Sequence, residues 1–154
     1  MRTFLIAAMA LILCVAGCDD DMAVLNPLLP SKPLVAPEHV RVQHVLIGFN
    51  GSVPGRDVTR TRNEAESLAQ DLLNSAWEGA DFEELVRSYS DASFPGIYAM
   101  ANDGVPNGAG EFRRSSFVSG FADVSFCLSV RNIGMAAYDP VTSPYGWHLI
   151  KRLE

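Results

Sequence analysis

Two histidines in strand-like stretches are the residues whose type and position best suit chemistry. His44 lies within Val40–Ile47 and His148 lies within Tyr145–Leu153, towards opposite ends of one domain. Period-two alternation puts each ring on a face that it shares with aliphatic side chains. A polar ring among buried aliphatics needs a hydrogen-bond partner, and two such rings on neighbouring strands can partner each other. The pair, rather than either histidine alone, indicates a functional site.

The residues between the histidines predict the elements that position them. Thr61–Glu64 is a capping box that starts an amphipathic helix, and Asp81 is placed to cap a second, shorter helix. The many Gly, Pro, Asn and Asp residues of 90–110 argue against regular structure there. The order of elements predicts an α+β domain with a mainly antiparallel sheet. A short helix and two further strands complete it, and we expect them within 117–128, 135–138 and 145–153.

The N-terminus has the pattern of an exported lipoprotein. An apolar run over residues 4–15 follows a positive charge, and it is shorter than the roughly 20 residues that a bilayer span needs. Val15–Cys18 resembles a bacterial lipobox, which implies cleavage after residue 17 and a lipid on Cys18. The alternative is an ordinary signal peptide in which Cys18 is incidental. We divide the chain into a lipoprotein signal peptide, a lipidated proline-rich tether and one domain, at 1–17, 18–37 and 38–154.

Cysteine usage and charge narrow the function classes. If Cys14 leaves with the signal and Cys18 carries lipid, Cys127 is unpaired, which excludes an intramolecular disulfide and a cysteine zinc site. The apolar neighbours of Cys127 favour an inert core thiol over a nucleophile working with His148. The net charge is −6, and Asp19–Asp21 lie beside the expected lipid. We therefore expect no nucleic-acid partner and no polybasic grip on a membrane.

Several segments together resemble the parvulin-type peptidyl-prolyl cis/trans isomerases, from about Val40 to the C-terminus. The resemblance implies a parvulin-like α+β fold, with a four-stranded, mainly antiparallel sheet and about three to four surrounding helices. It also implies rotation about X–Pro bonds, whose barrier is about 18–20 kcal/mol, with no cofactor and no metal. The segments are Val42–Ile47, Thr59–Ala65, Gly79–Leu85, Tyr89–Asp91, Phe121–Phe126 and Ser143–Arg152.

The resemblance assigns roles to the polar site residues. His44 and His148 match the family's paired core histidines, and Ser143 matches a hydroxyl that bonds within the histidine network. The family usually places a cysteine or aspartate near the imide, where this chain has Ala92. Asp91 stands one position early, as a catalytic carboxylate or as a residue that caps or turns the chain. Loss of one preorganised polar group raises the activation barrier by a few kcal/mol at most, so weak activity is expected.

Three phenylalanines complete the predicted substrate-binding set. Phe121 matches the aromatic wall of the proline pocket, and Phe117 stands where the family usually has methionine. Phe112 ends the segment that takes the place of the family's Gly-Gly-Asp-Leu-Gly run. Phenylalanines at such spacing more often form plain core. The joint pattern with the two histidines favours substrate binding for Phe121.

A basic cluster, Arg56, Arg60 and Arg62, precedes the first helix. Arginine forks suit phosphate, so a phosphopeptide site is one interpretation. A solvated helix start is the interpretation that we favour.

The sequence therefore predicts a peptidyl-prolyl isomerase that acts on proline-containing segments of exported or unfolded proteins. Its predicted location is the bacterial cell envelope, with the domain in the periplasm or on the outer surface and a lipid anchor at Cys18. The alternative is a catalytically weakened domain, marked by Ala92, that serves as a prolyl-peptide binding module or chaperone. A thiol hydrolase that uses Cys127 and His148 is the third interpretation.

Overall fold

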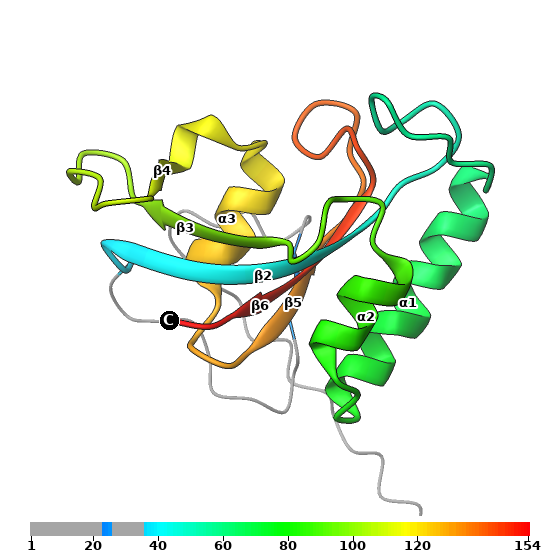
Figure 1. The fold of residues 1–154 in the computed structure, drawn as a ribbon, viewed down its shortest axis with the longest axis horizontal. Coiled ribbons are helices and arrows are strands. Elements are labelled where there is room, and N and C mark those ends of the chain that lie inside the picture. The colour runs from blue at the N-terminus through cyan, green and yellow to red at the C-terminus, as the bar shows by residue number, and fades with distance from the viewer. Residues whose placement is uncertain (1–22, 26–35) are drawn as a thin grey trace, which may run out of the picture.

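The computed structural model describes residues 23–25 and 36–154, and a sheet of six strands forms its centre (Figure 1). The strand order is β1-β5-β6-β2-β3-β4, and every neighbouring pair is antiparallel except β3 and β4. The strands are β1 (Ala23–Leu25), β2 (His39–Ile47), β3 (Ile97–Ala101), β4 (Phe112–Arg113), β5 (Ile133–Ala136) and β6 (Trp147–Arg152).

The predicted four-stranded antiparallel sheet corresponds to the centre, β5-β6-β2-β3. Short β1 and β4 extend it at the two edges, and β4 pairs in parallel with β3. Three α-helices and one short 3-10 helix, Arg114–Ser116, occur in the described part of the chain. The predicted α+β class is therefore confirmed.

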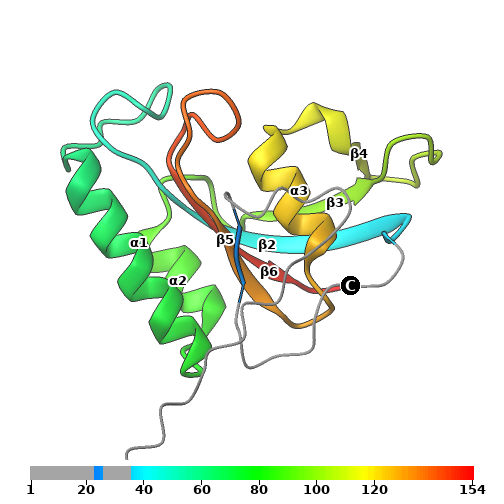
Figure 2. The ribbon, with the colours of Figure 1, turned by 180° about the vertical axis from the view of Figure 1, so that it is seen from behind.

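The helices cover both faces of the sheet. Helices α1 (Arg62–Trp77) and α2 (Phe82–Tyr89) lie together on one face, and α3 (Ser119–Cys127) lies on the other (Figure 2). Because helices cover both sides of the sheet, both faces of β2 are buried. Val45 and Ile47 pack with α1 and α2, whereas Val40 and Val42 pack with α3. Alternation then directs the side chain of residue 44 towards α3.

Both predicted helix starts are confirmed. The Thr61 hydroxyl accepts from the Glu64 backbone N–H at 3.3 Å, and the Glu64 carboxylate accepts from the Thr61 backbone N–H at 2.7 Å. Asp81 accepts from the backbone N–H of Glu83 at 2.9 Å, which caps α2. Helices of the length and apolar character that a membrane span requires do not occur among those described.

Strand β3 corrects the prediction that residues 90–110 lack regular structure. It pairs with β2 so that Tyr98 lies opposite Val42 and Met100 opposite Val40. The turn-forming residues flank this strand and do not interrupt it, since Gly96 precedes it and Asn102 follows it. The composition of the whole segment did not reveal a short strand within it, which pairs with the edge of β2 that β6 leaves open.

Cys127 corrects a second prediction. The residue is 2% exposed at the C-terminal end of α3, and its sulfur is disulfide-bonded. In this structure Cys127 is therefore not the unpaired thiol that the sequence predicted. A sulfur held in a disulfide is not a nucleophile, so the thiol-hydrolase interpretation is dropped. The signal peptide, Cys18 and most of the predicted tether lie outside the described residues, and the chain divisions stay predictions.

Candidate active site

The two histidines are diagonal neighbours on the α3 face of the sheet. The β2–β6 register places His44 opposite Ile150 and His148 opposite Leu46, so both rings emerge on the same face. Their Nδ1 atoms are 3.4 Å apart, and the ring planes differ by 13°. Each residue is 5% exposed. The mutual hydrogen bond predicted from the sequence is confirmed.

Burial keeps both rings neutral. It lowers the pKa of His44 from 6.5 to about 4, and burial together with the nearby His44 lowers the pKa of His148 to about 3. A neutral imidazole carries one N–H, so one Nδ1–H donates and the accepting ring carries its proton on Nε2. Both Nε2 atoms are buried and have no hydrogen-bond partner among the described residues. The pair therefore holds one unused N–H donor and one unused lone pair.

Aromatic rings line one side of the histidine pair. Phe121 of α3 lies 5.2 Å and 5.4 Å from the two histidine ring centroids. The ring centroid of Tyr98, on β3, lies 5.3 Å from that of His44 and 5.3 Å from that of Phe117. The Phe117 centroid lies 5.7 Å from that of Phe112. We call these four residues the aromatic cluster. Phe121 is 2% exposed and Phe112 is 50% exposed, so the cluster runs from a buried floor to an open rim.

Gly96 fixes the approach of β3 to the histidine on β2. The His44 backbone N–H donates to the Gly96 carbonyl at 2.9 Å. Gly96 has φ +65°, and a Cβ there would lie 2.7 Å from the His44 carbonyl oxygen. Only glycine suits both the backbone angle and the space. This close approach places Tyr98, two residues later, against the histidine ring.

Asp91 orders the loop that follows α2. Its carboxylate accepts from the Gly48 backbone N–H at 2.8 Å and pairs with the Arg60 guanidinium at 2.5 Å. Its own backbone N–H donates to the Leu46 carbonyl at 2.8 Å. None of these hydrogen bonds of Asp91 reaches the histidine pair. The structure thus places Asp91 where it ties the ends of β2 and α2 to the start of α1, and its catalytic role stays a prediction.

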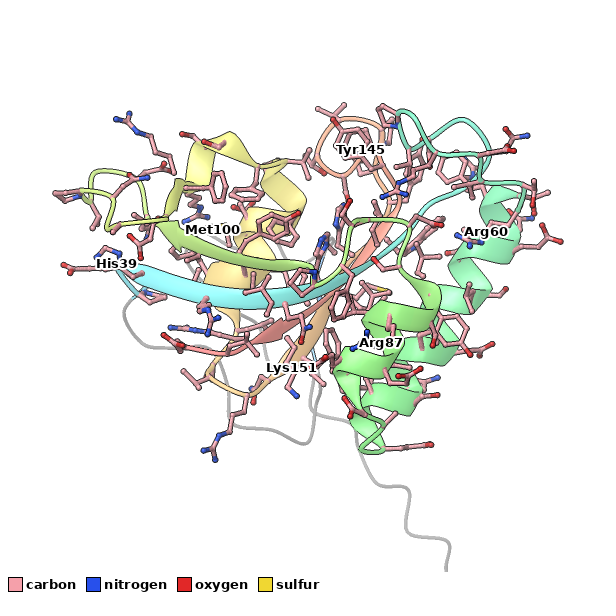
Figure 3. The ribbon with its side chains drawn as sticks, viewed as in Figure 1. His39, Arg60, Arg87, Met100, Tyr145 and Lys151 are labelled. Carbon is pink, nitrogen blue, oxygen red and sulfur yellow. The ribbon has the colours of Figure 1, made fainter. Side chains whose placement is uncertain are left out.

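The arginines before α1 are engaged within the domain. Arg60, at the start of α1 (Figure 3), has a side chain 27% exposed and paired with Asp91. Arg56 donates to the Ser93 hydroxyl at 3.0 Å, and Arg62 lies 5.9 Å from the Tyr138 ring centroid. The interpretation as a solvated face is therefore wrong for Arg60, because the Asp91 carboxylate lies within its reach in the fold.

Two predicted polar positions do not extend the histidine pair. Ser143 is fully buried, and its hydroxyl donates to the Gly146 carbonyl at 3.0 Å. The prediction that it bonds within the histidine network was wrong, because the turn before β6 brings that carbonyl to the hydroxyl instead. Ala92 is half-buried, and its backbone N–H donates to the Ser90 hydroxyl at 3.2 Å. A methyl group thus stands where the resemblance expects a thiol or carboxylate.

The arrangement suits a reaction on an uncharged, partly apolar group. An apolar ring can lie against the aromatic cluster while a polar atom faces the neutral histidine pair. Two rings with pKa values near 3 and 4 do not supply a proton at neutral pH. In the described part of the chain, three or more His, Cys, Asp or Glu side chains do not gather where they could hold a metal ion.

Sequence reasoning brought together His44, His148, Phe112, Phe117 and Phe121, and the structure places these residues in one site. It missed Tyr98 and Gly96. The signal was present, because Ile97–Ala101 is a short run with alternating larger side chains between turn-forming residues. We did not predict this strand because we treated residues 90–110 as irregular throughout.

Comparison with known proteins agrees on one family. A family model described as the PPIC-type PPIASE domain matches residues 31–154. The chain is 31% identical over 133 residues to Chaperone SurA of Methylobacillus flagellatus, which covers 86% of this chain and 26% of SurA. It is 33% identical over 123 residues to the putative peptidyl-prolyl cis-trans isomerase dodo of Drosophila melanogaster, which covers 76% of this chain and 67% of dodo. The chain thus spans about a quarter of the length of the SurA relative.

Solved structures share the fold. Peptidyl-prolyl isomerase ESS1 from Candida albicans has a TM-score of 0.58 at 26% identity, covering 80% of this chain and 67% of that chain. TbPIN1 has a TM-score of 0.53 at 24% identity, covering 76% of this chain and 98% of that chain, and supports the fold alone.

Proposed function

Because the chain belongs to the family of PPIC-type peptidyl-prolyl isomerase domains, we propose that it isomerises X–Pro bonds in exported or unfolded proteins. Its family membership confirms the parvulin-type resemblance that the two histidine segments indicated. One observation carries the proposed activity: the neutral His44–His148 pair lies directly against the aromatic cluster. The reaction rotates a bond and breaks none, so a charged acid or base is not required.

The site derives its chemistry from what it binds. Isomerisation must cross a barrier of about 18–20 kcal/mol, at which the imide is twisted and has lost its resonance. An enzyme accelerates this step when it binds the twisted form better than either planar form. The rings of Phe117 and Phe121 offer the proline ring an apolar surface away from water. The neutral His44–His148 pair forms the buried polar floor beneath these rings and holds them in place.

Exchange NMR on short Xaa-Pro peptides, with and without the purified chain, tests the activity. The unmodified chain should accelerate exchange, and Ala92→Asp should increase the rate further by restoring a polar group beside the imide. His148→Phe should lower the rate by roughly five- to ten-fold, because it removes the hydrogen bond to the His44 ring, and a hydrogen bond contributes about 1 kcal/mol. His39→Ala is the matched control, since His39 pairs with Glu111 outside the histidine pair and the aromatic cluster. No acceleration in several peptide contexts would contradict the proposal.

Ala92 supports a second candidate, a prolyl-peptide binding module or chaperone with little catalysis. The relative from Methylobacillus flagellatus carries the name chaperone. Saturable peptide binding by the unmodified chain, with no faster exchange until Ala92→Asp is introduced, would favour this candidate. Absence of any binding would exclude it.

We further propose that the chain is a lipoprotein of the bacterial cell envelope, anchored through Cys18 and with its domain in the periplasm or on the outer surface. The support is the lipobox-like Val15–Cys18 after an apolar run. Cys18→Ser should abolish labelling by a fatty acid and leave unprocessed precursor, whereas Cys14→Ser should leave labelling unchanged. A lipid and a disulfide cannot share one sulfur, so the mass of the mature chain without reductant distinguishes them. Labelling that persists in Cys18→Ser would contradict the anchor.

A further inference from the structure

The connection between β5 and β6 contains an ordered turn. The Asp139 carboxylate accepts from the backbone N–H groups of Val141 and Thr142, each at 2.8 Å, and from the Thr142 hydroxyl at 3.0 Å. The backbones of Asp139 and Ser143 also exchange two hydrogen bonds, at 3.0 Å and 3.3 Å. These bonds fix the conformation of the tip, residues 140–142, before any ligand arrives. We call residues 139–145 the β5–β6 turn.

The β5–β6 turn is seated on the helix that carries the aromatic cluster. The Gly120 backbone N–H, at the start of α3, donates to the Thr142 carbonyl at 2.8 Å. A Cβ on Gly120 would lie 3.0 Å from that carbonyl oxygen and 3.3 Å from the Ser143 Cβ, so the contact is close. The next residue along α3 is Phe121, which contacts both histidines. Val141 and Phe121 are therefore close in the fold, because Thr142, which follows Val141, is hydrogen-bonded to Gly120, which precedes Phe121.

This turn presents apolar side chains to solvent. Val141 is 83% exposed and Tyr145 is 38% exposed. Tyr145 ends the β5–β6 turn, between α3 and the loop that precedes α1 (Figure 3), and its carbonyl accepts from the Ser52 hydroxyl at 2.9 Å. Single exposed apolar residues are ordinary. Here two stand on an ordered segment beside the site, and Phe112 forms the exposed apolar rim of the aromatic cluster.

We propose that Val141 and Tyr145 determine substrate specificity, by contacting an apolar side chain next to the proline of an extended peptide bound over the aromatic cluster. This inference rests on the proposed function. The charge of the turn agrees, because the Asp139 carboxylate repels an acidic neighbour of proline. Arg56 and Arg60, which could attract one, are bound to Ser93 and Asp91. The expected order of preference beside proline is leucine or phenylalanine, then alanine, then glutamate.

The test compares Val141→Ser with Val130→Ser. Val130 is a matched control, because it is 49% exposed on the connection between α3 and β5, outside the β5–β6 turn. For each protein we would measure kcat/KM and Kd with two peptide series, one varied before proline and one varied after it. In one of the two series, Val141→Ser should raise the Kd and lower the kcat/KM of leucine peptides by roughly five-fold, and those of alanine peptides by less than about two-fold. Val130→Ser should change neither.

Equal effects of Val141→Ser on leucine and alanine peptides would overturn the inference. So would a change in sedimentation without a change in selectivity, which would make the turn a contact between copies of the chain. The Kd series reads selectivity even if the unmodified chain accelerates no peptide. A failure of the proposed isomerase activity is thus distinguished from a failure of this inference.

Discussion

The buried histidine pair predicts a specific loss of stability in mild acid. Histidine in the unfolded chain has a pKa near 6.5, whereas burial lowers the folded values to about 4 for His44 and about 3 for His148. Below pH 6.5 the unfolded chain therefore binds protons that the folded chain does not. Stability is fully present above that pH, and it falls as the pH drops towards the folded pKa values.

The magnitude follows from the width of that interval. Each uncompensated proton lowers the free energy of unfolding by about 1.4 kcal/mol per pH unit. Between pH 7 and pH 5 the titration covers roughly one and a half units below 6.5, so each histidine loses about 2 kcal/mol. The pair together loses about 4 kcal/mol. The carboxylates with lowered pKa values, Glu64, Glu111 and Asp139, have ordinary values of 4.5, 4.5 and 3.8 and contribute mainly at lower pH.

Urea unfolding at pH 7, 6 and 5 measures this loss, with fluorescence of the buried Trp147 as the signal. The variant His148→Phe keeps a ring of similar size and removes one titrating group, so its loss between pH 7 and pH 5 should fall to about 2 kcal/mol. Val130→Ser, at an exposed position without a titrating group, should retain the full loss. Equal losses in the unmodified chain and in His148→Phe would refute the reasoning, whatever their stabilities at pH 7.

Three further predictions concern residues that support the site. Asp91→Ala should lower the free energy of unfolding by about 2 kcal/mol, because it removes the acceptor of the Gly48 N–H and the carboxylate partner of Arg60. Exposed Asp57→Ala should lower it by less than about 0.5 kcal/mol, and equal effects in urea unfolding would contradict this. Gly96→Ala should cost about 2 kcal/mol more than Gly104→Ala in the same assay, since both have positive φ but only a Cβ on Gly96 meets backbone. Ser143→Ala should cost about 1–2 kcal/mol for the lost bond to Gly146, and the loss between pH 7 and pH 5 should not change. A changed pH dependence in Ser143→Ala would show that its hydroxyl does act on the histidines.

The sequence alone determined features that depend on local spacing. Period-two alternation around His44 and His148 placed both rings on aliphatic faces, and the structure confirms that they partner each other. The Thr61–Glu64 capping box likewise needs only residues close in the chain. The joint order of these segments with Phe121 was sufficient to indicate the family.

Only the tertiary structure decided how distant groups share their bonds. Ser143 has one hydroxyl hydrogen, and the turn before β6 directs it to a carbonyl that no spacing rule identifies. Arg60 and Asp91 lie on different connections, so their pairing depends on how α1 and α2 pack against β2. Tyr98 became a site residue because β3 adds to the open edge of β2, and pairing between strands is a property of the sheet and not of its local composition. Local sequence patterns indicate which face of a helix or strand is buried. The hydrogen-bond and packing partners of a side chain depend on how those elements pack together.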